Sequence, residues 1–201
     1  MNKIITVSRQ FSSGGREFGR RLAEELGIAY YDKEVITAIA EHTSLSEDYV
    51  RQIVDRKPHN LYPITVGHSL TYVDDYAIKR FQSIFTAQDE IIKDLASKSD
   101  CLFVGRCSDY ILREMNPYRI YVYATMESRV KRCLDKRRDD EDYLTEKEAK
   151  KQVQLVDKNR SKYYEYYTGY RWGDIENYDL CINSTNTNMK ELVPVVAKMF
   201  K

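Results

Sequence analysis

The sequence predicts an α/β fold in which five parallel strands form a sheet flanked by helices. Two observations predict it: five short apolar runs alternate with segments of helical periodicity, and the first run leads through a small-residue turn into an amphipathic helix. Strands that alternate with helices imply a parallel sheet with right-handed crossovers. A chain of 201 residues suits one large α/β domain, so we expect a single domain over residues 1–201.

The expected strands are rich in β-branched and aromatic residues, which fit a buried sheet. They span 4–7, 28–31, 101–104, 120–123 and 180–182. The segments between and after them carry apolar residues at helical spacing, and one of them opens with a capping box that begins at Thr145. We expect helices at 18–26, 33–41, 44–56, 72–97, 109–115, 127–138, 145–164 and 189–200.

Composition argues against several classes of function. The net charge of +1 argues against a general nucleic-acid-binding surface. No apolar run approaches the ~20 residues of a membrane span. The chain enters its first strand without a secretory signal, so we expect a cytoplasmic protein. The four cysteines form no C-x-x-C pair and are expected as thiols rather than disulfides. Both a monomer and a homodimer are compatible with the sequence.

The turn after the first strand has the composition of a phosphate-binding loop. It consists of Ser12, Ser13, Gly14 and Gly15. Backbone N–H groups of such a turn can converge on an anion at the positive end of the helix dipole. The stretch departs from the pattern G-x-x-x-x-G-K-[ST], because Gly15 stands at the lysine position and Glu17 at the hydroxyl position. Arg16 could supply the cation instead. An ordinary strand-to-helix turn is the alternative interpretation.

Two charged residues end strands at the edge where open α/β sheets bind ligands, outside the carboxyl ends of the strands. Asp32 follows the second apolar run, and Arg106 follows the third. An arginine beside a glycine can bind a planar anion with two hydrogen bonds. Equally, Asp32 could merely cap the next helix and Arg106 could form a structural salt bridge.

Two later segments each have two interpretations. The helix expected at 127–138 is strongly basic, so it is either a solvated helix or a cationic clamp over phosphates. Tyrosines concentrate in 163–173. This segment either packs on the domain, which we favour, or offers a stacking surface to a base or a neighbouring subunit.

Four stretches together resemble the cytidylate kinase-like group of P-loop kinases, in collinear order over nearly the whole chain. They are VSRQFSSGGREFGRRLAEELG, YYDKEVI, FVGRCSDYIL, and VDKNRSKYY with DLCINSTN. The resemblance implies a nucleoside monophosphate kinase fold with strand order 2-3-1-4-5. It also implies an acceptor-side flap at about 44–72 and a lid over the donor at about 137–172. Lys33 replaces the serine that follows the aspartate in cytidylate kinases, so the resemblance does not single out CMP as the acceptor.

The resemblance and the chemistry of phosphoryl transfer together imply a set of site residues. Donor phosphates would bind Ser12, Ser13, Gly14, Gly15, Arg16 and Glu17. The acceptor would bind Asp32, Arg106, Arg129 and Asp157. The catalytic cations would be Arg16, Arg137, Lys158 and Arg160. Mg²⁺ would be held through water by Glu17 and Asp32.

The implied activity is transfer of the γ-phosphoryl group of ATP to a small acceptor, a nucleoside monophosphate. The alternative is a nucleotide-binding or regulatory protein that has kept the fold and lost efficient transfer, because the loop lysine is missing. A third interpretation is an RNA- or protein-interaction module built on the tyrosine segment, which the near-neutral charge disfavours.

Overall fold

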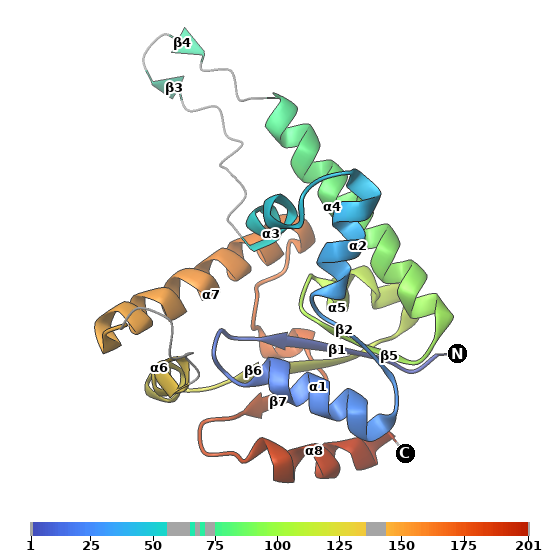
Figure 1. Ribbon diagram of the computed structural model, residues 1–201, viewed down its shortest axis with the longest axis vertical. Helices are drawn as coiled ribbons and strands as arrows, with labels where there is room; N and C mark the ends of the chain where they lie inside the picture. The colour runs from blue at the N-terminus through green and yellow to red at the C-terminus, as the bar shows by residue number, and fades with distance from the viewer. Residues whose placement is uncertain (1, 56–64, 67–68, 71–74, 136–143, 201) are drawn as a thin grey trace.

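Five parallel strands form the central sheet (Figure 1). The computed structural model describes residues 2–55, 65–66, 69–70, 75–135 and 144–200. The strands are β1 (Ile4–Arg9), β2 (Ala29–Tyr31), β5 (Cys101–Val104), β6 (Tyr118–Tyr123) and β7 (Leu180–Asn183). Their spatial order is β2-β5-β1-β6-β7, and every adjacent pair is parallel. The predicted order 2-3-1-4-5 is therefore confirmed.

β1 lies in the middle of this sheet and pairs with β5 on one side and β6 on the other. Its first five residues are buried, as expected for a parallel strand that is covered on both faces. Only Arg9, the last residue of the strand, is partly exposed. The loop that follows β1 therefore leaves the sheet at the centre of its carboxyl edge.

Helices cover both faces of the sheet (Figure 1). One face is covered by α1 (Gly15–Leu26) and α8 (Met189–Ala197), which pack on each other and on the sheet. The core of the other face combines residues from α2 (Glu34–Thr43), α3 (Glu47–Asp55), α4 (Asp75–Lys98), α5 (Ser108–Ile111) and α7 (Glu146–Thr168). A third, small cluster joins α6 (Met126–Asp135) to the start of α7.

Most expected helices are present, with shifted ends. The segment 109–115 is split into α5 and a 3-10 turn, η1 (Arg113–Met115), which ends at Asn116 with φ 56°. Further 3-10 turns are η2 (Ile175–Asn177) and η3 (Lys198–Phe200). The sequence did not predict the short antiparallel hairpin of β3 (Thr65–Val66) and β4 (Ser69–Leu70), which lies in the predicted flap. Residues 136–143, which include the predicted catalytic Arg137, lie outside the described ranges.

The longest helix of the C-terminal half, α7, begins with the predicted capping box. Thr145 accepts a hydrogen bond from the Glu148 backbone N–H, and the Glu148 side chain accepts one from the Thr145 N–H. The helix runs to Thr168 and ends at Gly169, whose φ is 73°. Tyr163 and Tyr164 near its end are buried in the core. The tyrosine segment therefore packs largely on the rest of the chain.

Within the described ranges, no helix combines the length and the apolar character that crossing a membrane would require.

Candidate functional site

Small residues determine the backbone conformation of the loop between β1 and α1. Ser12 and Gly14 both have positive φ, 58° and 85°. The Ser13 hydroxyl donates to the Gln10 carbonyl at 2.9 Å and accepts from the Gly15 N–H at 3.4 Å. The Phe18 N–H then donates to the Gly14 carbonyl, which begins the helix. Glycine at position 14 suits this turn because it adopts positive φ without steric cost.

The loop offers donors at a helix N-terminus. Among the described residues, no protein carbonyl accepts a hydrogen bond from the backbone N–H of Gly14, Gly15 or Arg16. The first N–H groups of a helix have no partner within the helix and carry the positive end of its dipole. The loop borders a cavity of about 1030 Å³. This arrangement can bind an anion such as a phosphate group.

Side chains from the C-terminal half of the chain brace the loop from outside. The Ser184 hydroxyl donates to the Ser13 carbonyl at 2.6 Å. Arg132 of the basic helix α6 donates to the Ser12 carbonyl at 3.1 Å and to the Ser184 carbonyl at 3.4 Å. Arg132 therefore helps to hold the loop, and it also lines the large cavity, so an additional contact with a bound phosphate stays a prediction.

Arg129 and Asp157 form an ion pair between α6 and α7. Their side chains are only 7% and 16% exposed. The other carboxylate oxygen of Asp157 accepts from the Phe11 N–H at 2.7 Å, so this pair also fixes the loop. Neither residue lines the large cavity or the small one described below. Direct contact of these two residues with an acceptor, which the resemblance implied, therefore has no support in this geometry.

Asp32 ends β2 as a buried carboxylate surrounded by arginines. Arg16 Nε lies 2.6 Å from one carboxylate oxygen, and Arg9 Nη2 lies 3.8 Å from the other. The N-cap of α2 is Lys33, and no side chain makes the capping hydrogen bond. Asp32 therefore does not act as the helix cap. Its role is to hold the cation of the loop residue Arg16.

A strained turn follows β5. Gly105, Arg106 and Cys107 all have positive φ, at 69°, 61° and 54°. Non-glycine residues pay roughly 1–2 kcal/mol each for this conformation. The buried Gln88 side chain donates to the Arg106 carbonyl at 2.9 Å and helps to hold the turn. Strain of this kind clusters at functional sites, where it positions a side chain.

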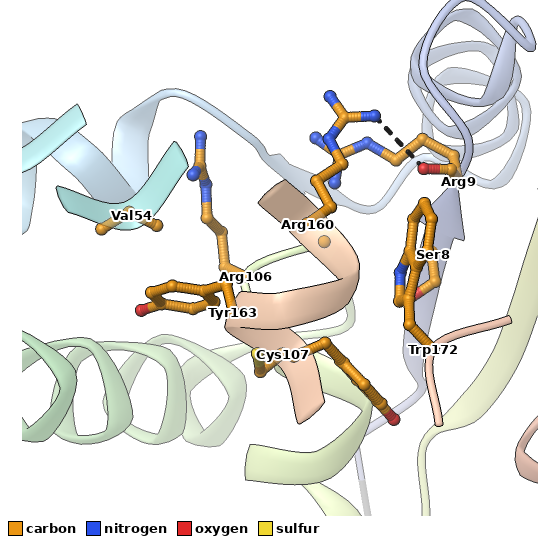
Figure 2. Close-up of a pocket in the computed structure, with 10 residues that line it drawn as sticks. Ser8, Arg9, Val54, Arg106, Cys107, Arg160, Tyr163 and Trp172 are labelled. Atoms are coloured by element: carbon orange, nitrogen blue, oxygen red, sulfur yellow. Dashed lines mark hydrogen bonds between the residues drawn. The ribbon is translucent and has the colours of Figure 1, made fainter. Parts of the chain in front are cut away.

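Three arginines from different elements meet at the carboxyl edge of the sheet. Arg9, Arg106 and Arg160 line a small cavity of about 40 Å³, and Figure 2 shows their side chains converging on one side of it. Arg160 of α7 donates to the Arg9 carbonyl at 3.3 Å. Burial lowers the pKa of Arg9 well below its usual value, and the charges of Arg160 and Arg106 lower it further, whereas Asp32 opposes this effect. Three guanidinium groups thus lie together at this edge of the sheet, which favours an anion.

The small cavity and the large cavity share Arg9 and Arg160. The predicted site residues that line the large cavity are Ser12, Gly14, Gly15, Arg16, Glu17, Asp32 and Arg160. Ser13 belongs to the loop but is fully buried and lines neither cavity. Arg106 lines only the small cavity. Lys158 lines neither cavity. The structure therefore brings most of the predicted donor-side residues, and two of the four predicted acceptor-side residues, to two adjoining spaces.

Sequence reasoning missed the role of Arg9. Arg9 is the last residue of the first strand and was not among the predicted site residues. Its side chain is only 12% exposed. A signal was present, because Asp32 and Arg106 were singled out for the same position at the ends of neighbouring strands.

The described residues contain no group of three or more histidine, cysteine, aspartate or glutamate side chains that could hold a metal ion by itself. Mg²⁺ in phosphoryl-transfer sites needs only one or two carboxylates besides substrate phosphates and water. Glu17 and Asp32 both line the large cavity. Asp32 Oδ1 is buried and accepts no hydrogen bond from the described residues, so it can accept one from a metal-bound water. The two carboxylates fit an outer-shell magnesium site.

A parallel sheet of this order, with an anion-binding loop at the carboxyl end of its central strand, defines a P-loop kinase-like protein. The chain belongs to the cytidylate kinase-like family, whose sequence model matches residues 4–186. No curated protein sequence matches the chain.

Solved structures with the same fold cover nearly the whole chain. An uncharacterized protein from Eubacterium ventriosum ATCC 27560 has 22% identity and a TM-score of 0.68, with 98% of each chain covered. Shikimate kinase from Bacteroides thetaiotaomicron has 10% identity and a TM-score of 0.56, again with 98% of each chain covered. Shikimate kinase from Acinetobacter baumannii in complex with shikimate has 14% identity and a TM-score of 0.54, with 100% of this chain and 93% of that chain covered. At these identities the similarity shows the fold alone.

Proposed function

We propose that the protein is a phosphotransferase that moves the γ-phosphoryl group of ATP to a small anionic acceptor, with nucleoside monophosphates as the preferred class. The observation that carries this proposal is the arginine cluster of Arg9, Arg106 and Arg160. The cluster adjoins the phosphate loop, and two of its members, Arg9 and Arg160, line both cavities. Phosphoryl transfer depends on positioning and on neutralising charge on oxygens, and guanidinium groups supply both.

The large cavity, of about 1030 Å³, has room for a nucleotide, whereas the small one, of about 40 Å³, has room only for a small group such as the phosphate of the acceptor. The donor phosphates bind the backbone N–H groups of Gly14, Gly15 and Arg16 at the large cavity, with the side chains of Arg16 and Arg160 beside them. The acceptor binds where Arg106 faces the small cavity and Asp32 faces the large one. Arg160 lines both cavities, so its guanidinium can contact the phosphoryl group both on the donor and on the acceptor.

In the proposed reaction, an acceptor oxygen forms a bond to the γ-phosphorus of ATP while the bond from that phosphorus to the β,γ-bridging oxygen breaks. ADP leaves with the bonding electron pair. A phosphate monoester has its second pKa near about 6, so at neutral pH the attacking oxygen of a nucleoside monophosphate carries no proton. The reaction therefore requires no general base from the protein. Mg²⁺, held through water by Glu17 and Asp32, would supply further neutralisation of the donor phosphates.

A coupled assay of ADP formation, with ATP, Mg²⁺ and each nucleoside monophosphate in turn, tests the proposal. We expect ADP to form in step with a phosphorylated acceptor. Titration calorimetry with ATP is run in parallel. Magnesium-dependent ATP binding without transfer to any acceptor would favour the alternative of a nucleotide-binding or regulatory protein. Absence of ATP binding would instead favour an interaction module.

A pair of variants separates an acceptor effect from a general loss of charge. Arg106→Gln is expected to raise KM for the acceptor while leaving KM for ATP little changed, because Arg106 lines only the small cavity. Arg119→Gln is the matched control. Arg119 pairs with Asp179 at the opposite, amino-terminal part of β6. Equal effects of both substitutions would contradict the assignment of Arg106 to the acceptor.

A further inference from the structure

The phosphate loop lacks the lysine that P-loops place against the donor phosphates. The residue predicted to replace it, Arg16, is held elsewhere in the structure. Its Nε lies 2.6 Å from Asp32, and its side chain is 56% exposed. An exposed arginine bound to a carboxylate is a poor substitute for a cation fixed beneath the phosphates. The structure contains a better one.

Arg9 and Gly15 occupy one continuous space. A Cβ atom added to Gly15 would lie 2.5 Å from the Arg9 Cβ and 3.1 Å from its Cγ, closer than such atoms can approach. Gly15 stands at the lysine position of the pattern, and Arg9 stands six residues earlier, where the pattern has its first glycine. Glycine and the cationic residue have thus exchanged positions, and the stem of Arg9 fills the space that a lysine at position 15 would need.

The guanidinium of Arg9 is directed across the end of β5. A Cβ added to Gly105 would lie only 1.7 Å from Arg9 Nη1, so this glycine leaves room for the guanidinium to pass. Arg9 therefore reaches from the α1 side of the sheet to the edge where the two cavities adjoin. The stem of Arg9 thus lies close to Gly15 and its guanidinium close to Gly105, and the side chain is only 12% exposed. A charge held in such a buried position loses little freedom when it binds an anion.

We propose that Arg9 takes over the role of the missing loop lysine and neutralises the phosphoryl group in transit. The inference rests on the proposed function and names the residue that makes transfer possible without the lysine. Arg9 contacts the γ-phosphoryl oxygens at the junction of the two cavities. The bond changes are those given above, and Arg9 gains or loses no proton during them.

Arg9→Met keeps the length of the stem and removes the charge. We expect it to lower kcat by roughly 10²–10³-fold, the loss seen when one fixed donor to a transition state is removed. Arg9→Lys restores a cation and is expected to recover part of that loss. Arg119→Met is the control for loss of an arginine outside the site and should keep wild-type kcat, because its ion pair with Asp179 is far from the carboxyl edge of β6.

A paired exchange tests the shared space directly. Gly15→Lys alone is expected to lower the midpoint of thermal unfolding, because its side chain collides with Arg9. Arg9→Gly combined with Gly15→Lys restores the first glycine and the lysine of the usual loop pattern, and should transfer at least about tenfold faster than Arg9→Gly alone. If the double variant is folded, as judged by circular dichroism, and is no faster than Arg9→Gly, the inference that Arg9 occupies the place of the loop lysine is refuted.

A second readout does not depend on transfer. A non-hydrolysable ATP analogue carries the γ-phosphoryl group and ADP does not, so the ratio of their affinities reports contact with that group. The wild type is expected to prefer the analogue, and Arg9→Met is expected to lose this preference while keeping its affinity for ADP.

The two readouts separate the possible failures. Absence of transfer in the wild type, together with a preference that depends on Arg9, would refute the phosphotransferase and keep the role of Arg9. Full activity and an unchanged preference in Arg9→Met would refute the role of Arg9 and keep the enzyme. A wild type with neither transfer nor preference would overturn both.

Discussion

At the scale of single residues, the site is an arrangement of cations around one carboxylate. Asp32 Oδ2 lies 2.6 Å from Arg16 Nε and holds that side chain near β2. Its other oxygen, Oδ1, lies 3.8 Å from Arg9 Nη2. Breaking a buried ion pair is costly, but Arg16 is 56% exposed and water screens much of this pair. Asp32 therefore matters more for where the arginines point than for the stability of the fold.

Gly105→Ala is expected to displace the Arg9 guanidinium. Both the positive φ of 69° and the 1.7 Å approach to Arg9 Nη1 oppose a side chain at this position. Gly27→Ala is the matched control, because Gly27 has a similar φ of 65° and open space around it. Each variant should lose roughly 1–2 kcal/mol of unfolding free energy from the backbone. Only Gly105→Ala should also reduce transfer, and equal activities of the two variants would refute the contact.

Arg160→Ala is expected to weaken transfer more than folding. Arg160 lines both cavities, and its hydrogen bond to the Arg9 carbonyl is long at 3.3 Å. Loss of a charge-assisted contact to the transition state costs about 2–4 kcal/mol, or roughly 30- to 1000-fold in kcat. Kinetics and urea unfolding measure the two effects separately. Lys151→Ala, an exposed position on the same helix, is the control. A stability loss as large as the loss in transfer would assign Arg160 to the fold.

The sequence identified most residues of the site and missed how they pair. Small residues before an amphipathic helix predict an anion-binding loop, and charged residues after apolar runs predict the ligand edge of the sheet. Whether Arg16 faces a phosphate or Asp32 depends on distances between elements that no local pattern contains. The contact of Arg9 with Gly105 joins two strands far apart in the chain and was equally invisible.

At the scale of elements, α7 contributes to both the core and the site. Its capping box at Thr145 fixes where the helix starts, and caps of this kind contribute about 1 kcal/mol. Tyr163 and Tyr164, near its other end, are buried in the core. The lid predicted at 137–172 therefore includes residues that cannot move without opening the core. Any closure is confined to the part of the helix before Tyr163.

Hydrogen exchange with and without an ATP analogue tests that closure. We expect added protection in residues 144–160, which carry Arg160 and the large-cavity residues Leu144 and Gln152. Residues 163–168 should already be protected without nucleotide, because Tyr163 and Tyr164 are buried in the core and Tyr167 packs against it. Unchanged exchange across 144–160 on binding would remove the lid from the proposed mechanism.

Capping and periodicity predicted where α7 begins, because these signals are local. The β3–β4 hairpin was not predicted, since each of its strands has two residues and no apolar alternation marks them. The split of the segment after Arg106 also escaped prediction. The break falls at Leu112, whose φ of −91° and ψ of 8° leave the helical region, and no local pattern in the sequence marks it.

At the scale of the whole molecule, two carboxylates should give opposite dependences of stability on pH. Burial raises the pKa of Asp109, although the Tyr164 hydroxyl, at 2.8 Å, opposes the shift. Asp109 therefore contributes stability that is complete below its unfolded pKa near 3.8 and is lost as pH rises through the folded pKa. Burial also acts on Asp179, but hydrogen bonds from Arg119 lower its pKa. Asp179 therefore contributes stability to the protein above about pH 3.8, and this contribution is lost as pH falls through the lowered pKa.

Urea unfolding at a series of pH values checks both signs. Relative to the wild type, Asp109→Asn is expected to gain stability as pH rises from about 4 to 8. Asp179→Asn is expected to lose most at neutral pH and to approach the wild type as pH falls below about 4. Parallel curves for the two variants would contradict the assignment of the shifts to burial in one case and to Arg119 in the other.

The order of strands in the sheet has a consequence for how the protein is made. β1 pairs with strands that begin at Cys101 and Tyr118, and β2 pairs only with β5. The two strands that leave the ribosome first are thus not neighbours, and no pair of the parallel sheet can form until β5 has been synthesised. The phosphate loop follows β1, which is synthesised first and has no partner strand until β5 is made. The residues whose side chains hold the loop, Arg132, Asp157 and Ser184, are synthesised after β5. The loop therefore lacks these contacts until Ser184 has been synthesised, and the segment before β5 is the stretch on which a chaperone would have the most time to act.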